Sequence, residues 1–521
     1  MRERGTSGGH AAGDLTRRAS LNAVASATDY AARLVVGFVV NPILVTGLGS
    51  LAYGVWQVIG RLVGYISPAS GRPTQTLKWT IANRQASADV EEKRRQVGSA
   101  IVVAVIFLPI LVTLGLVVSW FAPAWLRSPV ELVWPIRIAT FLLVVNLVAL
   151  NFVSIPRSVL EGENLGYKRM GLSALLVFVG GGLMIAAVKL GAGLPGVAAA
   201  TTAATILTGL TFLFVVRAYV PWFAVRWPSR AEARAFLSLS WWFLGWRLVM
   251  QLLRASDVVV LGVADSPELV TVYALTRYVP ETLITFVGML VFGVAPGLGG
   301  LIGAGKLKKS ADVRAEMMAF TWLLATVAGV GILLWNRSFV GLWVGPEFYA
   351  GDLENLMIVL LSVQFVLLRN DANIIDLTLD LKSKVIVGGI ASLLAIGLAL
   401  AGLLLFDAGI VGLCVGFLAG RAVLGLAYPK MVGETLATPL GGQLLASVRP
   451  TLVACLLFVA ALLLAPRAAV ASWAALVAVS GLTVLIVGPV AFYAGLSRGA
   501  RLRLAERTSR VIESLRSGRP S

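Results

Sequence analysis

Long apolar runs follow one another along most of the chain, and short polar segments separate them. A helical run of about 20 apolar residues is long enough to cross the hydrocarbon core of a bilayer. The pattern therefore predicts an all-α protein with about fourteen membrane-spanning helices. They are expected over residues 21–45, 50–68, 97–121, 132–155, 171–190, 195–216, 238–263, 269–295, 316–335, 356–379, 385–406, 409–428, 450–465 and 469–495.

The two halves of the chain share an order of features. The segments "GLGSLAYGVWQVIGR" (47–61) and "GVADSPELVTVYALTR" (262–277) both run from a glycine-started turn through an aromatic residue to an arginine. In each half a proline and a basic loop then follow. This order predicts two six-helix lobes related by an axis along the membrane normal. The expected parts are a tail (1–18), an N-lobe (19–220), a C-lobe (235–430), a helix pair (448–496) and a basic amphipathic tail (497–521).

The composition supports a polytopic membrane protein. Of the 521 residues, 58% are hydrophobic and only 13% are charged, which is too apolar for an ordinary soluble domain. The single histidine, His10, lies in the first polar segment, so we expect no histidine catalysis and no metal site within the membrane. No phosphate-binding loop and no nucleophile beside a base stand out, so we expect no enzyme activity and no cofactor.

The distribution of basic residues predicts the orientation. With the N-terminus inside, the expected cytoplasmic segments hold 32 of the 44 Lys and Arg residues, and the expected periplasmic segments hold four. Positive charge favours the cytoplasmic side, so both termini are expected in the cytoplasm. The net charge of +18 then faces anionic membrane lipids, and nucleic acid is not an expected partner.

One span carries an unusual number of polar residues. In "LGWRLVMQLLRASDVVVLGV" (244–263), Arg247, Gln251, Arg254 and Asp257 follow one another at steps of four, three and three. This spacing places all four on one face of a helix. Each isolated charge costs at least about 2.5 kcal/mol in hydrocarbon, so this face should contact protein or water.

Other spans carry similar stripes, which together predict a polar cavity between the lobes. The first span has Asn22, Asp29 and Arg33 on one face, and the tenth has Arg369, Asn373, Asp376 and Asp380. The residues expected to contact a substrate are Arg33, Gln57, Arg61, Arg247, Gln251, Arg254, Tyr273, Arg277 and Arg421. The carboxylates expected to couple transport to a proton or sodium gradient are Asp29, Asp257 and Glu281.

A structural interpretation of some of these charges stays open. Opposite charges three or four residues apart on one helix can neutralise each other. Such pairs are Asp29 with Arg33, Arg254 with Asp257, and Arg277 with Glu281. Three arginines, Arg61, Arg247 and Arg421, have no acidic partner at this spacing. Arg137 lies near a helix end, where a long side chain can reach the membrane surface.

Several arginines in one cavity favour an anionic substrate. Guanidinium groups bind phosphate oxygens with two parallel hydrogen bonds and keep their charge in a low dielectric. A diphosphate attached to a polyprenyl lipid combines an anionic head group with a tail that stays in hydrocarbon. We therefore expect a substrate of this kind.

The residues now described resemble the multidrug/oligosaccharidyl-lipid/polysaccharide exporter superfamily, and within it the bacterial polysaccharide-biosynthesis flippases. The resemblance covers about residues 15–430. It depends on "NPILVTGLGSLAYGVWQV" at the start of the second span, "VAPGLGGLIGAGK" at the end of the eighth, and the buried arginines. Two features depart from the commonest pattern: fourteen spans instead of twelve, and a cytoplasmic loop of about 28 residues after Pro68.

The resemblance implies two helix bundles that alternate between inward-open and outward-open forms. The implied substrate is an undecaprenyl-diphosphate-linked oligosaccharide, carried to the periplasmic leaflet for cell-surface polysaccharide synthesis. Basic cavity residues of the family correspond here to Arg33, Arg61, Arg247, Arg254 and Arg277. Fourteen spans leave a lipid II flippase open, and the long loop leaves a cytoplasmic partner open, such as another polysaccharide-assembly protein.

Three other functions compete with this one. A cation-coupled multidrug exporter of the same fold would need an acidic or aromatic cavity, whereas this chain supplies arginines. A membrane glycosyltransferase or polymerase would need larger external loops than the longest one expected here, residues 336–355. A relative that only scaffolds partners and transports nothing is the last alternative.

The expected topology can be tested by cysteine labelling of intact cells. A membrane-impermeant reagent should modify a cysteine placed at Ser266 or Asp352, because both lie in expected periplasmic segments. It should leave a cysteine at Ser87 or Ser310 unmodified. Labelling at Ser310 from outside would show that the number of preceding spans is wrong by one.

Overall fold

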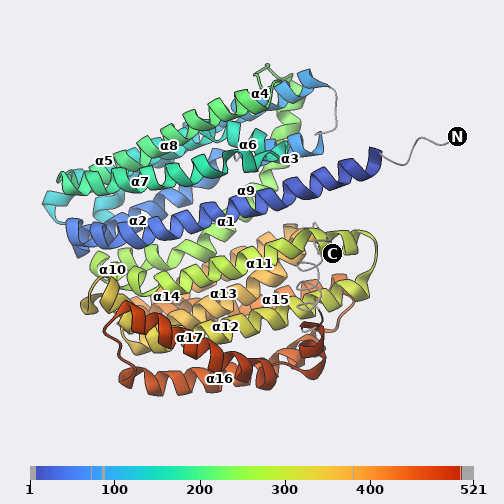
Figure 1. Ribbon diagram of the computed structural model, residues 1–521. Helices are drawn as coiled ribbons and strands as arrows, with labels where there is room; N and C mark the ends of the chain where they lie inside the picture. The colour runs from blue at the N-terminus through green and yellow to red at the C-terminus, as the bar shows by residue number, and fades with distance from the viewer. Residues whose placement is uncertain (1–6, 72, 85–88, 379–380, 505, 507–521) are drawn as a thin grey trace. The chain divides into compact units, whose positions relative to one another are not determined.

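The computed structural model describes residues 7–71, 73–84, 89–378, 381–504 and 506 (Figure 1). These residues form helices joined by short turns, and no strand occurs among them. Asp380 and most of the expected tail over 497–521 lie outside the described residues.

Each expected span corresponds to a helix, apart from the eighth, which is divided in two. The helices of the first seven spans are α1 (Ser7–Leu48), α2 (Ser50–Ile66), α4 (Val90–Trp125), α5 (Val130–Val153), α7 (Met170–Lys189), α8 (Gly193–Tyr219) and α9 (Arg230–Ala264). Those of the last seven are α10 (Pro267–Thr276) with α11 (Tyr278–Gly303), then α12 (Leu307–Trp343), α13 (Asp352–Thr378), α14 (Leu381–Leu404), α15 (Gly409–Leu436), α16 (Leu440–Leu464) and α17 (Trp473–Val490). Eleven segments of the described chain are long and apolar enough to cross a membrane. The prediction of a polytopic all-α membrane protein is confirmed.

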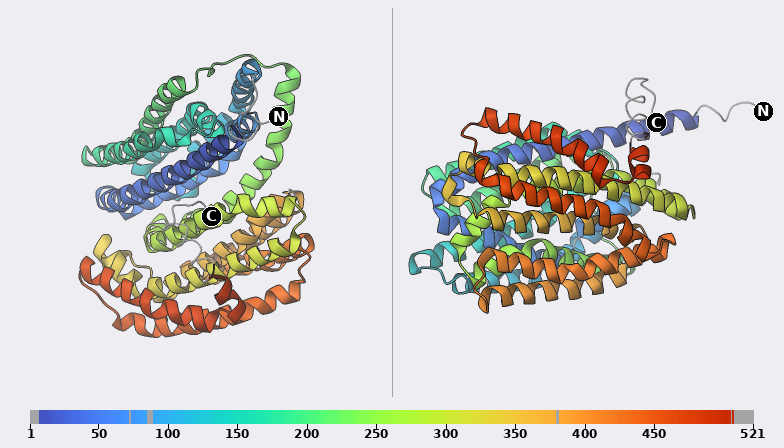
Figure 2. Two further views of the ribbon diagram at one scale, coloured as in Figure 1. Left: turned by 45° about the vertical axis from the view of Figure 1, so that its right-hand side comes forward. Right: turned by 90° about the horizontal axis from the view of Figure 1, so that it is seen from below.

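Tertiary contacts divide the chain into two compact parts, unit 1 (Met1–Ala255) and unit 2 (Ser256–Ser521). The division falls inside α9. Figure 2 shows that most of the long helices within each unit run alongside one another, as expected of helices that cross a bilayer together. The six-helix lobes predicted from the repeat stay a prediction.

In unit 1, two short helices lie in loops that the apolar pattern did not resolve. They are α3 (Pro73–Asn83), in the loop after Pro68, and α6 (Ile155–Gly162), after α5. Leu77 and Ile81 of α3 pack in a buried cluster with Val159 and Leu160 of α6. Gly162 permits this approach, because a Cβ atom there would lie 2.8 Å from the Ile81 side chain. The expected long loop is therefore partly a packed helix.

In unit 2, α14 and α15 pack along a seam of small residues. Gly412, Gly416 and Gly420 of α15 stand four residues apart and face Gly402, Ala399 and Ala395 of α14. Small residues at this spacing let helix backbones approach closely, where dispersion and weak hydrogen bonds stabilise the pair without a hydrophobic effect in lipid.

The final two helices pack against α12. Phe458 and Ala461 of α16 and Val487 of α17 join the buried cluster around Val330 and Leu333 of α12. Trp335 of α12 also donates a hydrogen bond of 2.9 Å from Nε1 to the Thr483 hydroxyl of α17. This pair of helices is therefore part of the core of unit 2.

The predicted start of the thirteenth span is wrong. We expected Pro450 to begin it, but α16 starts at Leu440 and Pro450 lies inside the helix. A proline removes one backbone donor, and a helix can continue through it when its neighbours hold the chain. Here Arg449 donates from Nε to the Ala494 carbonyl at 2.7 Å and from Nη2 to the Tyr493 carbonyl at 3.1 Å, which fixes this part of α16 to the π-helical turn Ala491–Gly495 after α17.

The seam predicts opposite effects for two glycine-to-alanine changes in α15. At Gly416 the new Cβ would overlap the backbone of Ala399, so Gly416→Ala should destabilise the protein by about 1–3 kcal/mol. At Gly425 the Cβ meets open space, so Gly425→Ala should be neutral or stabilise by up to about 1 kcal/mol. Thermal unfolding in detergent measures both, and equal effects would contradict the seam.

Candidate functional site

In unit 1, the candidate residues of α2 and α9 gather around one contact. A Cβ atom at Gly64 of α2 would collide with the side-chain amide of Gln251 of α9, so the two helices approach closely there. Arg61 stands three residues before Gly64, and Arg254 stands three residues after Gln251. Both arginines are half-buried. Arg61 and Arg254 therefore each stand about one helical turn from this contact, on α2 and α9.

The remaining candidates of unit 1 lie on the same helices or on α1. Arg247 is half-buried one turn before Gln251, and Gln57 is half-buried one turn before Arg61. Arg33 of α1 is exposed on the surface of unit 1.

In unit 2, three candidate residues form one hydrogen-bonded group. The Tyr273 hydroxyl donates to Oδ2 of Asp257 at 2.9 Å, and Nη1 of Arg277 pairs with the same oxygen. The other oxygen, Oδ1, accepts from the backbone N–H of Val258 at 2.9 Å. Asp257 and Tyr273 are buried and Arg277 is half-buried. The carboxylate thus has a partner on each side, and the arginine that binds it comes from another helix segment.

A break in the eighth span positions Arg277. The residue stands between the end of α10 and the start of α11, with helical angles of φ −77° and ψ −9°. Pro280 has no N–H to donate to the Thr276 carbonyl four residues earlier. The side chain of Asn336 of α12 donates to that carbonyl instead, at 2.8 Å. Proline chemistry thus divides the helix at the arginine, and an amide from α12 satisfies the released carbonyl.

Arg421 of α15 lies in an aromatic setting. It is buried, with its guanidinium 5.0 Å from the ring centroid of Phe417 and 5.9 Å from that of Phe365. Cation–π contacts of this kind offset part of the cost of burying a charge. Its position on an apolar helix is thereby explained without an acid in the same helix.

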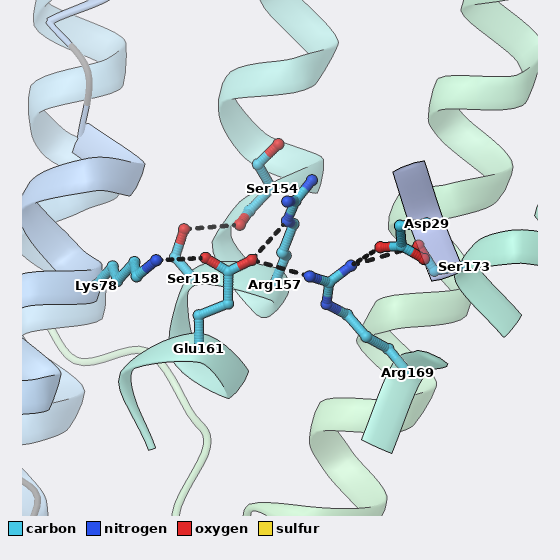
Figure 3. Close-up of polar contacts among 8 residues, drawn as sticks. All are labelled: Asp29, Lys78, Ser154, Arg157, Ser158, Glu161, Arg169 and Ser173. Carbon is cyan, nitrogen blue, oxygen red and sulfur yellow. Dashed lines mark hydrogen bonds and ion pairs between the residues drawn. The ribbon is translucent and has the colours of Figure 1, made fainter. Parts of the chain in front are cut away.

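The structure gives Asp29 a partner that the sequence did not indicate. Asp29 of α1 pairs with Arg169 at 3.0 Å and not with Arg33, the residue four positions later in the same helix (Figure 3). Arg169 precedes α7, and its Nη1 also donates to the Ser173 hydroxyl at 3.3 Å. The in-helix pairing considered for Asp29 is therefore replaced by one between elements.

Glu161 is the centre of this ionic cluster. It accepts from Arg157 at 2.8 Å, from Lys78 at 3.0 Å and from Arg169 at 3.1 Å, and Figure 3 shows the three cations converging on its carboxylate. Together with Asp29 the cluster joins α1, α3, α6 and the turn before α7. The sequence signal for this cluster was Glu161, an acidic residue between the basic residues Arg157 and Arg169 in one short segment.

The segment between α8 and α9 is also held by ion pairs and hydrogen bonds. At the start of α4, Arg94 donates from Nε to the Trp222 carbonyl at 2.9 Å, and Arg95 pairs with Glu232 at 2.9 Å. The pKa of the Glu232 carboxyl is lowered, first because the Ser229 backbone N–H donates to it and also because Arg95 lies beside it. The chain is therefore fixed to α4 just before it enters α9.

Unit 2 has two further ion pairs that the sequence did not indicate. Arg314 of α12 binds Asp371 of α13 with two parallel hydrogen bonds, at 2.8 Å and 2.9 Å, and both side chains are buried. The buried Lys384 of α14 donates to the partly exposed Asp376 and to the Ala372 carbonyl, both at 2.6 Å. No group of three side chains that could hold a metal ion occurs among the described residues.

Comparison with protein families decides the classification. The sequence model of the polysaccharide biosynthesis protein family matches residues 22–295. The chain belongs to this family. No curated protein matches the sequence.

Two solved structures share the fold at low sequence identity. The lipid II flippase MurJ in an inward closed conformation has a TM-score of 0.65 at 14% identity, covering 90% of this chain and 98% of its own. An inward-facing multidrug resistance MATE family transporter has a TM-score of 0.58 at 17% identity, covering 79% of this chain and 96% of its own. The MATE transporter is a member of the multidrug/oligosaccharidyl-lipid/polysaccharide superfamily, and with the family match the resemblance predicted from the sequence is confirmed. The protein is a multi-pass membrane protein of the polysaccharide biosynthesis protein family and shares its fold with these two transporters.

The ion pair between Asp257 and Arg277 makes a prediction about stability. Asp257→Ala leaves the Arg277 charge without this carboxylate, so it should destabilise the protein by about 3–5 kcal/mol. The double change Asp257→Ala/Arg277→Ala should cost less, because neither charge remains. Thermal unfolding in detergent compares the two, with Asp265→Ala at an exposed position as the control. A double variant less stable than Asp257→Ala would contradict the pairing.

Proposed function

We propose that the protein is a flippase that moves a polyprenyl-diphosphate-linked oligosaccharide from the cytoplasmic to the periplasmic leaflet. The observation that carries the proposal is the group of half-buried basic and amide side chains around the α2–α9 contact. Guanidinium groups are suited to a diphosphate, since each can bind two oxygens at once. The family to which the chain belongs supports polysaccharide synthesis as the purpose.

In this proposal the substrate contacts are Arg33, Gln57, Arg61, Arg247, Gln251, Arg254, Tyr273, Arg277 and Arg421. The first six belong to unit 1 and the other three to unit 2. The membrane is the bacterial inner membrane, with both termini in the cytoplasm. Anionic lipids and other polysaccharide-assembly proteins are the proposed partners.

Energy for transport against a gradient has to come from a ligand or ion that binds the two states differently. We propose proton or sodium coupling through Asp29, Asp257 or Glu281. Asp257 is the most informative of the three, because one of its oxygens accepts hydrogen bonds from both Arg277 and Tyr273. Protonation of that carboxylate would weaken its bond to Arg277 and so link ion uptake to the arrangement of α9 and α10.

Two transport alternatives keep specific support. The MurJ structure is that of a lipid II flippase, and lipid II flipping uses the same head-group chemistry. A multidrug exporter is supported by the MATE fold. Cationic drugs need a cavity that attracts positive charge, whereas the α2–α9 contact supplies arginines.

Export of lipid-linked oligosaccharide by the arginine variants tests the proposal. Each charge-assisted phosphate contact contributes about 1.5–3 kcal/mol, so Arg247→Ala and Arg254→Ala should each reduce export by about one to two decades. Arg→Lys should restore part of it, because lysine keeps the charge but not the two-pronged geometry. Arg217→Ala, an exposed basic residue at the end of α8, is the control and should export normally.

Three outcomes would count against parts of this proposal. Full export by well-expressed Arg247→Ala would show that this arginine makes no phosphate contact with the substrate. Arginine variants that export lipid-linked oligosaccharide normally but alter the drug tolerance of the cells would favour the multidrug exporter. If flipping in proteoliposomes continued after both proton and sodium gradients were collapsed, the proposed ion coupling would be ruled out, but the proposed substrate would not.

A further inference from the structure

Two tryptophans enclose an arginine where the end of α4 meets the start of α5. The Arg137 guanidinium lies 3.8 Å from the ring centroid of Trp120 on α4 and 5.2 Å from that of Trp134 on α5. Its Nε also donates to the Trp120 carbonyl at 3.4 Å. The cation is therefore held by two rings and a backbone oxygen, in a defined position.

The charge of this arginine is not neutralised by a carboxylate. Among the described residues no acidic side chain pairs with Arg137, and Glu131, in the first turn of α5, is exposed. Other basic residues of unit 1 behave differently, because Lys78, Lys93 and Arg169 each pair with a glutamate. Arg137 thus presents a positive charge that is oriented but not paired with an acid.

The surroundings place this charge at a membrane surface. Trp120 and Trp134 are 56% and 62% exposed, and Phe121 and Trp125 of α4 are exposed beside them. Tryptophans collect where hydrocarbon meets lipid head groups. Toward the middle of the bilayer, α4 and α5 expose apolar side chains such as Leu116 and Phe141, as expected of a lipid-facing surface.

We propose that Trp120, Trp134 and Arg137 form a binding site for the phosphodiester head group of a membrane phospholipid. The site lies in the leaflet that contains the end of α4 and the start of α5, remote from the ionic cluster around Glu161. The rings hold the guanidinium by cation–π contact and leave its terminal N–H groups for phosphate oxygens. The exposed indole faces then lie against the glycerol and the first methylene groups of the same lipid.

Extension of the Arg137 side chain to water at the membrane surface would not by itself account for these contacts. A long cation near a helix end extends to the surface whether or not aromatic rings lie beside it. Two rings on different helices, together with the backbone contact, instead restrict the guanidinium to one place. Such restriction reduces the entropy lost when a ligand binds, which favours a specific lipid contact.

Lipid retention by the purified protein tests this site. The full chain would be mixed in detergent with phosphatidylglycerol or with diacylglycerol, which lacks the phosphate, and bound lipid counted by native mass spectrometry. Arg137→Gln should lower phosphatidylglycerol retention about five- to tenfold and leave diacylglycerol retention unchanged. Phosphatidylglycerol retention by Arg137→Lys should lie between that of the unchanged protein and that of Arg137→Gln, because lysine lacks the planar group that stacks on both rings. The control is Arg467→Gln, an exposed basic residue of unit 2, which should match the unchanged protein.

A second measurement does not depend on detergent. In vesicles of equal parts phosphatidylcholine and phosphatidylglycerol, bromine atoms on the lipid near its glycerol should quench tryptophan fluorescence less in the Trp120→Leu/Trp134→Leu variant than in the unchanged protein.

Equal lipid retention by Arg137→Gln and the unchanged protein would overturn the site, as would an equal loss of lipid in Arg467→Gln. Displacement of the lipid by millimolar inorganic phosphate would also overturn it, since it would show a site for free phosphate.

Discussion

A charge that is buried among membrane helices has to be compensated there, and this requirement determines which helices of the protein are joined. Water is too far away to solvate it, and an isolated charge is costly. In unit 2 the compensation comes from Asp257 with Arg277 and from Arg314 with Asp371. Each pair joins two helix segments, so the buried polar side chains also fix the packing around them.

The helices were predictable because apolar length is a one-dimensional property. Runs of about 20 apolar residues located the spans, including the pair α16 and α17. The short helices α3 and α6 were missed, since their apolar residues, such as Leu77 and Leu160, are few and separated by polar ones. The break at Arg277 was missed for another reason: Pro280 was visible in the sequence, but the donor that replaces its N–H comes from Asn336, fifty-six positions later.

The candidate site was predicted only in part, and the limit was the identity of the partners. Helical spacing showed that Arg247, Gln251 and Arg254 share a face, and the structure brings Gln251 against Gly64. Spacing can suggest partners only within the same helix. It therefore could not indicate that Asp29 pairs with Arg169, 140 residues away, because that depends on how α1 packs.

The divided eighth span has a consequence for how unit 2 can move. Because proline has no amide hydrogen, Pro280 leaves the Thr276 carbonyl without its α-helical donor. An unsatisfied carbonyl is expensive in a membrane, and here the Asn336 side chain of α12 satisfies it. Bending at the junction of α10 and α11 should therefore either break this bond or carry α12 along, so that one asparagine side chain couples the movement of three helices.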